Sequence, residues 1–168
     1  MKSRSITGLV LAALLALPAT AKAQSQGSGV WLGALGGAEW GDASGYQLRG
    51  DAEVPITRPS TKMLVSGVLS VSYSGLEHDL SVFELVPAAR LGWTLSQQFG
   101  AYADVGLGYA HASANGHGVS GSTMRIGAGA TYALSSKARF VVELAAHPHW
   151  GDYDQTTTTL MLGAKFRI

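Results

Sequence analysis

Cysteine is absent from the 168 residues of this sequence. Its absence excludes a disulfide-linked scaffold, thiolate metal sites and cysteine catalysis. An excess of one charge is also lacking, since 12 basic residues face 11 acidic ones, and this excludes the basic surface of a nucleic-acid-binding protein. With 46% hydrophobic residues and 22 glycines, the chain is neither disordered nor dominated by apolar runs, and its length suits one domain.

The N-terminal segment has the features of a cleaved secretory signal peptide. Lys2 and Arg4 precede an apolar run over residues 6–17, and Ala21-Lys22-Ala23 has the small-x-small pattern of a signal-peptidase site. The run is shorter than the roughly 20 apolar residues of a membrane-spanning helix. We therefore predict a signal peptide over residues 1–23 and a single domain over 24–168. Cleavage removes three of the 12 basic residues and leaves nine against 11 acidic ones.

Beyond residue 23 the apolar and polar residues alternate with the period of two that is typical of β-strands. In the last segment, for example, Leu160, Leu162 and Phe166 alternate with Met161, Gly163 and Lys165. We count eight such segments, an even number, as a closed antiparallel barrel in a bacterial membrane requires. The segments are residues 29–40, 45–55, 62–73, 81–93, 99–112, 122–133, 139–150 and 155–168. One set of connections comprises residues 56–60, 94–98 and 134–138, and the other comprises 41–44, 74–79, 113–121 and 151–154.

The aromatic residues indicate which face of the strands meets lipid. A soluble sandwich or soluble periplasmic barrel also alternates, but here the aromatics on the apolar parity fall at strand ends. Three pairs, 83 and 93, 99 and 109, and 140 and 150, lie ten residues apart, which spans roughly 25 Å in a tilted strand. This is the height of the apolar band of an outer-membrane barrel. Two aromatic girdles are predicted: Trp40, Tyr46, Tyr73, Phe83, Tyr109 and Trp150 in one, and Trp93, Phe99, Tyr132, Phe140 and Phe166 in the other.

One aromatic does not follow this pattern. Trp31 falls on the parity assigned to the inside, and a bulge or a different start of the first strand would explain it. The pattern as a whole predicts an all-β fold, an eight-stranded antiparallel up-and-down transmembrane β-barrel with short loops.

Charged residues fall on the opposite parity, because a charge in lipid is costly whereas a charge in the lumen can be paired. Ten charged residues are predicted inside: Glu39, Arg49, Asp51, Glu53, Glu84, Arg90, Asp104, Arg125, Glu143 and Lys165. The other ten sort to the two ends, with acids such as Asp152 at one end and bases such as Arg139 at the other. Eight strands enclose a lumen just wide enough for side chains to fill. We therefore expect a plugged, charged interior, with a narrow leak of small ions as the alternative.

The pattern resembles the small eight-stranded outer-membrane barrels of the OmpA/OmpX type over residues 24–168. The last strand resembles the C-terminal signal read by the barrel-assembly machinery, with Leu160, Leu162, Ala164 and Phe166 on alternate positions, although Ile168 stands where an aromatic is usual. The resemblance implies an integral protein of the outer membrane of Gram-negative bacteria, monomeric and without a cofactor. It also implies that both termini are periplasmic and that lipids and lipopolysaccharide are its partners.

The function implied is non-enzymatic, a contribution to envelope integrity or to surface interactions. The alternative is an outer-membrane acyl hydrolase that modifies lipid A or phospholipid. His111 and Ser113 match the His-x-Ser spacing of the lipid A deacylase family and share an outward face, where a serine nucleophile and a histidine base could reach an acyl chain. That family carries the motif near its last hairpin, where this chain has His147-Pro148-His149 instead.

A metal site is a further possibility, because all five histidines fall at or near the same predicted end as the loop acids. Imidazole and carboxylate ligands suit Zn²⁺. The best-placed trio is His147, His149 and Asp152, although polar loops have these residues without any ligand.

Overall fold

The computed structural model describes residues 29–168. The predicted signal peptide, residues 1–23, lies outside the described residues. Within residues 29–168, no helix is long and apolar enough to cross a membrane.

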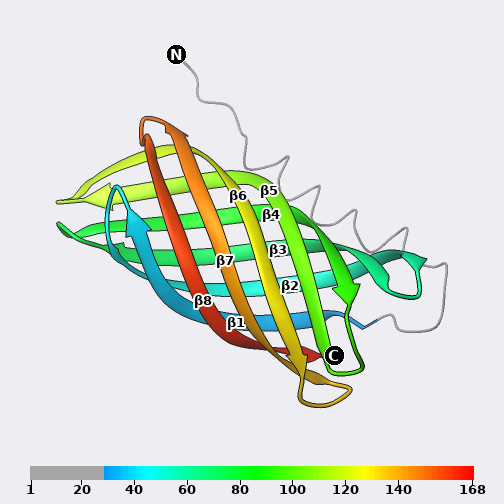
Figure 1. The fold of residues 1–168 in the computed structure, drawn as a ribbon. Coiled ribbons are helices and arrows are strands. Elements are labelled where there is room, and N and C mark those ends of the chain that lie inside the picture. Colours follow the sequence, from blue (N-terminus) through cyan, green and yellow to red (C-terminus); the bar gives the residue numbers. More distant parts are fainter. Residues whose placement is uncertain (1–28) are drawn as a thin grey trace.

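The described chain consists of eight β-strands joined by short connections (Figure 1). Their bounds are β1 Trp31–Gly41, β2 Gly45–Ser60, β3 Met63–Leu76, β4 Leu80–Thr94, β5 Phe99–Ala114, β6 His117–Ala133, β7 Ala138–Gly151 and β8 Gln155–Arg167. Each strand pairs antiparallel with the next, and β8 returns to pair with β1, so the sheet closes into a barrel. The predicted eight-stranded antiparallel up-and-down barrel is confirmed.

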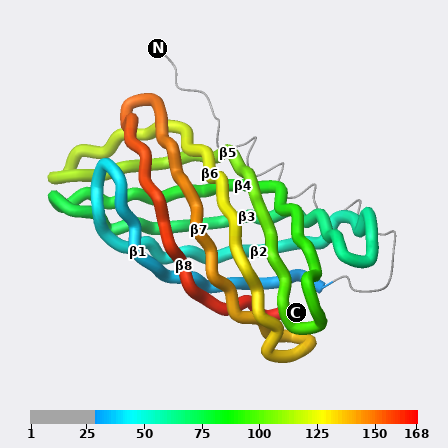
Figure 2. Tube along the Cα trace, in the orientation of Figure 1, coloured from blue at the N-terminus to red at the C-terminus, as the bar shows by residue number. Residues whose placement is uncertain are grey.

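The chain passes back and forth between two ends of the barrel (Figure 2). We call the end with connections 61–62, 95–98 and 134–137 the turn end; β1 begins there and β8 finishes there. The other, with connections 42–44, 77–79, 115–116 and 152–154, is the loop end.

Two predicted connections are wrong because the strands continue through them. β2 extends through residues 56–60, with its register shifting between Pro55 and Thr57 and again before Ser60. Proline has no N–H for the strand ladder, which fits such an irregularity. The predicted loop 113–121 is a hairpin whose turn is Asn115-Gly116, and both residues have positive φ. Asn-Gly is the pair that favours a two-residue hairpin turn, so the sequence carried a signal for it.

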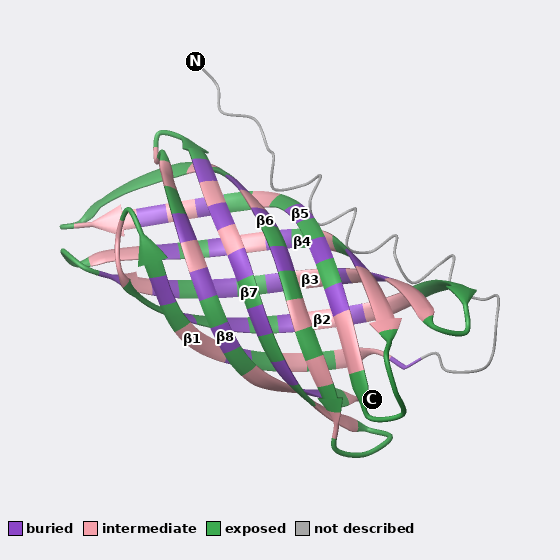
Figure 3. Ribbon diagram, in the orientation of Figure 1, coloured by how far each residue is buried: buried purple, intermediate pink, exposed green. Residues whose placement is uncertain are grey.

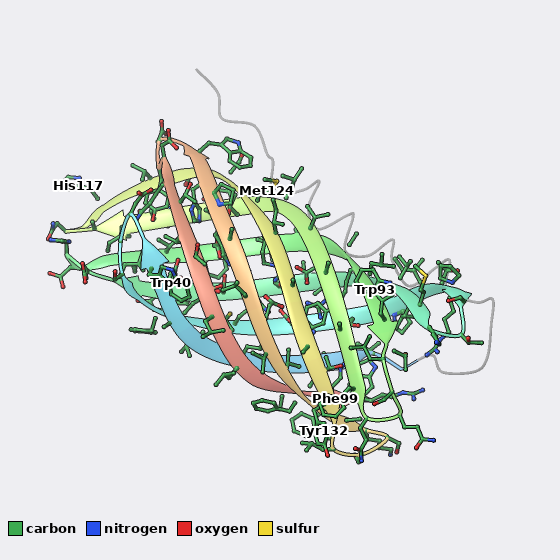
Figure 4. All side chains as sticks on the ribbon, viewed as in Figure 1. Trp40, Trp93, Phe99, His117, Met124 and Tyr132 are labelled. Carbon is green, nitrogen blue, oxygen red and sulfur yellow. The ribbon has the colours of Figure 1, made fainter. Side chains whose placement is uncertain are left out.

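The two faces of the sheet differ as the alternation predicts, and buried and exposed residues alternate along each strand (Figure 3). The outer face carries apolar side chains and the aromatics of both predicted girdles. At the turn end the strand register places Tyr132 opposite Phe99 on one side and Phe140 on the other, and the Phe99 and Tyr132 rings lie 5.0 Å apart. Figure 4 shows Phe99 and Tyr132 together near the C-terminus and Trp40 toward the opposite end.

Trp31 faces the inside, and the proposed bulge or altered strand start is wrong. β1 pairs with β2 and with β8 from Trp31 onward without a register shift. The Arg139 guanidinium carbon lies 4.1 Å from the centre of the Trp31 ring. The indole is therefore a stacking partner for a basic side chain at the turn-end mouth of the barrel.

Candidate functional site

The interior of the barrel is polar, and the structure places all ten predicted charged residues there. None of the ten is more than 5% exposed. Buried charges are tolerated when they are paired and hydrogen-bonded, so the pairing pattern defines what the interior can do. Nine of the ten fall into two groups, a central network toward the turn end and a Glu84 cluster toward the loop end, whereas Glu39 is buried without an ion pair among residues 29–168.

The central network joins acids and bases from β2, β4, β5, β6, β7 and β8. Arg49 binds Glu143 at 2.5 Å and Asp51 at 3.0 Å, and Lys165 lies 3.2 Å from Asp51 and 3.0 Å from Glu53. The Arg49–Glu143 pair joins β2 to β7, which lie three strands apart in the ring, so it reaches across the lumen. The Lys165 contacts join β8 to β2, past the intervening β1.

Arg90 holds the other half of this network. Its guanidinium donates to Asp104, to Glu53 at 3.0 Å and to Glu143 at 3.3 Å, and lies 3.8 Å from the centre of the Tyr102 ring. Arg125 donates to Asp104 at 3.1 Å. An arginine has five N–H donors in a planar fork, which suits several carboxylates at once.

Arg139 also belongs to this network and was not predicted inside. Its Nη2 donates to Glu53 at 2.8 Å. The inward residues of β7 are odd-numbered, as Glu143 is, so the parity of residue 139 was the signal that could have found it. Because Arg139 is the second residue of β7, it was assigned to the end of the barrel instead of to the interior.

The Glu84 cluster contains no arginine or lysine. The Glu84 carboxylate accepts hydrogen bonds from Ser72 at 2.7 Å and Thr123 at 3.1 Å, and its other contacts are with Gln47, His147 and His149. His149 Nε2 is 2.8 Å from Glu84, and its Nδ1 is 3.2 Å from the carbonyl oxygen of Gln155. The two ring nitrogens of His149 thus face a carboxylate oxygen on one side and a backbone carbonyl oxygen on the other.

Tyr153, in the connection between β7 and β8, packs over this cluster. Its ring lies 5.1 Å from that of His149 in an edge-on arrangement. Burial raises the pKa of Tyr153 above its ordinary value, and the nearby carboxylates of Glu39, Glu84 and Asp42 raise it further. Its hydroxyl group, buried and without a hydrogen-bond partner within the described chain, stays protonated.

The structure does not bring together the predicted metal trio. His147 and His149 point into the barrel and are buried, whereas Asp152 is exposed in the loop. Among residues 29–168, no three His, Asp or Glu side chains are arranged to hold a metal ion. The two histidines lie at the loop end, as predicted. They occupy odd-numbered positions of β7, which face the interior, and there they contact Glu84 instead of Asp152.

The predicted His111–Ser113 pair is likewise not formed. Both residues lie on the outer face, but His111 Nδ1 is 3.0 Å from the hydroxyl oxygen of Ser120, which in turn lies 2.7 Å from the Tyr109 hydroxyl. The Asn115-Gly116 turn sets the register that pairs His111 with Ser120. This contact could not be predicted while residues 113–121 were expected to form a loop, because it depends on the pairing of β5 with β6.

Comparison with known proteins identifies the fold and the family. No curated protein matches the sequence. The family model described as "Outer membrane protein beta-barrel domain" matches residues 9–166. Among solved structures, Neisserial surface protein A has a TM-score of 0.63 at 12% identity, over 85% of this chain and 98% of that chain.

Two further solved structures share the fold. The outer membrane enzyme PagL has a TM-score of 0.57 at 17% identity, over 82% of this chain and 99% of that one. Ail, the attachment invasion locus protein of Yersinia pestis, has a TM-score of 0.53 at 20% identity, over 84% and 97%. These likenesses show the fold, and the family match covers most of the sequence. The chain therefore belongs to the family of outer membrane protein β-barrel domains and is an integral barrel of the outer membrane.

Proposed function

We propose that this protein is a non-enzymatic outer-membrane barrel with a plugged interior that contributes to envelope integrity or to surface interactions. The observation that carries the proposal is the central network, in which Glu143 of β7 pairs with Arg49 of β2 and with Arg90 of β4, each three strands away in the ring. An ion passing through would have to break buried, hydrogen-bonded pairs, which is costly in a low dielectric. The interior thus supports a rigid wall element rather than a pore.

The same proposal assigns an orientation and partners. The loop end faces outward and the turn end, with both termini, faces the periplasm. The outer face contacts lipid and lipopolysaccharide, and β8 serves as the signal for the barrel-assembly machinery. We propose that the barrel acts as a monomer, because its edges are closed by the pairing of β1 with β8 and offer no free strand for another copy.

Two measurements test the plugged-barrel proposal. Purified protein in a planar lipid bilayer is expected to give no steady unitary conductance, and a reproducible open level would contradict the plugged interior. In cells, deletion of the gene is expected to raise the uptake of a hydrophobic dye, and the wild-type gene is expected to restore the barrier. If dye uptake and detergent sensitivity are both unchanged, the role in envelope integrity is excluded, and surface interaction is the role that remains.

A second candidate function is an acyl hydrolase of outer-leaflet lipid, because His111 and Ser120 are in contact on the outer face at the loop end. A serine hydroxyl beside an imidazole is the minimal nucleophile and base for ester hydrolysis. The fold shared with the enzyme PagL supports the hydrolase. The lack of an acid paired with His111 weighs against the hydrolase. Among residues 29–168, the histidines that contact a carboxylate are His147 and His149.

Mass spectrometry of lipid A and phospholipids separates the two functions. The samples are cells that express wild-type protein, Ser120→Ala, Ser113→Ala or an empty vector. The plugged-barrel proposal expects four identical spectra. Loss of an acyl chain with wild type and Ser113→Ala, but not with Ser120→Ala, would establish the hydrolase with the His111–Ser120 pair.

A further inference from the structure

The turn-end mouth of the barrel contains two adjoining cavities, which neither proposed function uses. The outer cavity, of about 260 Å³, opens beside Trp31, and the inner one, of about 110 Å³, reaches Ser66 and Glu53. Thr94, Gly100, Thr131 and Arg139 line both, so the two form one vestibule that leads from the mouth into the barrel. A water molecule needs about 10–15 Å³ of such space, so either cavity has room for a group of several heavy atoms.

Arg139 stands where the two cavities meet, with hydrogen-bonding capacity to spare. Its guanidinium is held on one face by Trp31 and at Nη2 by Glu53, and its side chain is only 18% exposed. The Nε–H group is buried and has no partner in the described chain. A guanidinium fixed in this way keeps one N–H donor unpaired, and arginine binds carboxylate and phosphate groups through such donors.

Ser66 supplies a second unsatisfied group in the inner cavity. The residue is 1% exposed, and its hydroxyl oxygen is buried with no hydrogen-bond partner among residues 29–168. Buried polar groups are nearly always satisfied, so the Ser66 hydroxyl can still form a hydrogen bond with a polar group in the cavity. Thr94 and Thr131 line the same space.

The charge at this end favours an anion. In the central network five basic side chains, those of Arg49, Arg90, Arg125, Arg139 and Lys165, face four carboxylates, those of Asp51, Glu53, Asp104 and Glu143. Glu53 alone contacts three of the bases. One positive charge thus lacks a matching carboxylate, and Arg139 is the base of the network that lines both cavities.

We propose that this vestibule is a binding site for a phosphate group, held by Arg139 at the junction and by the hydroxyls that line the inner cavity. An oxyanion would supply acceptors to the free Nε–H of Arg139 and to the Ser66 hydroxyl, and would balance the excess charge. The phosphate group can come from inorganic phosphate or from the headgroup of a phospholipid at the barrel mouth. The site is independent of the loop end and of the outer face.

Nuclear magnetic resonance of the folded protein tests this site. The isotope-labelled barrel is prepared in a sugar-based detergent and a phosphate-free buffer, so that neither supplies the ligand. It is titrated at constant ionic strength with inorganic phosphate, with a short-chain phosphatidylglycerol or with chloride. We expect saturable shifts of the Trp31 indole N–H and the Arg139 Nε–H with at least one of the two phosphate compounds, and none with chloride. The compound that saturates at the lower concentration identifies the source.

Three variants complete the test. Arg139→Gln is expected to weaken binding by about tenfold or more, because it removes a charge-assisted hydrogen bond. Lys137→Gln makes the same charge change at an exposed residue of the turn end that lines neither cavity, and it is expected to bind as wild type does. Ser66→Val fills the inner cavity without changing the charge and is expected to weaken binding as well.

The outcomes that overturn the site are distinct. No saturable shift with either phosphate compound excludes it, and an equal loss in Lys137→Gln and Arg139→Gln indicates surface charge instead of a site. If Arg139→Gln fails to fold because Glu53 loses a partner, Ser66→Val decides the question, and unchanged binding by that variant overturns the proposal.

Discussion

Glu84 is the residue on which the loop-end half of the interior depends. Its carboxylate collects the hydrogen bonds of Ser72 and Thr123 and holds both buried histidines. The change Glu84→Gln removes the carboxylate charge that both buried histidines contact. We expect it to lower the free energy of unfolding by about 3 kcal/mol, the cost of breaking a buried pair on one side. Urea unfolding in lipid vesicles, followed by tryptophan fluorescence, measures this value.

Glu77→Gln is the matched control for that change. Glu77 is a carboxylate of the loop end that is exposed to solvent. Its substitution is expected to change stability by no more than about 0.5 kcal/mol. Similar values for the two variants would mean that the Glu84 cluster does not stabilise the barrel.

At the level of single residues, the alternation along each strand predicted which charged side chains are buried, but not which of them form ion pairs with one another. The ten inward charges followed from alternation, because one strand position fixes the face of all the others. Which carboxylate meets which base depends on the tilt and shear of the closed ring, as with Arg49 of β2 and Glu143 of β7, which are 94 residues apart. No local pattern encodes such a contact, and the union of His147 and His149 with Glu84 was missed for the same reason.

At the level of elements, the seam between β1 and β8 closes the barrel and depends on a small residue. A Cβ atom added at Gly163 would overlap the backbone of Ala34 and Leu35 in β1. Gly163→Ala is therefore expected to strain the seam and to destabilise the barrel by about 1–3 kcal/mol. The same change at Gly67 of β3 would meet only the end of the Ile56 side chain, at 3.6 Å, and is expected to be neutral. Thermal unfolding of the two variants in detergent compares them, and equal melting temperatures would refute the role of Gly163.

The elements themselves could be predicted where one face meets an apolar environment. Alternation is strict there, so the eight strands and their faces followed from the sequence. Beyond that zone both faces of a hairpin are free to be polar, and the pattern fades, as in residues 56–60 of β2 and 113–121 of the β5–β6 hairpin. The ends of these strands are set by hydrogen-bonding partners and by the Asn115-Gly116 turn rather than by hydrophobicity.

At the level of the whole molecule, the apolar outer band is what distinguishes a membrane barrel from a soluble one with the same topology. Leu144 lies on the outer face of β7 between the girdle residues Phe140 and Trp150, and is 52% exposed. Leu134 is 63% exposed in a connection of the turn end, outside the band. The two leucines are thus alike in exposure and differ in the solvent they meet.

Leu144→Arg and Leu134→Arg test that difference. In lipid vesicles Leu144→Arg is expected to destabilise the folded barrel by about 2–4 kcal/mol, because an arginine near the bilayer midplane loses its hydration, whereas Leu134→Arg is expected to cost about 0–1 kcal/mol. The measurement is equilibrium unfolding of each variant in the same vesicles. A barrel whose outer face met water would accept both changes alike, since an exposed arginine is well solvated at either position. Equal stabilities would therefore contradict a lipid-facing band at Leu144, whichever end of the barrel faces outward.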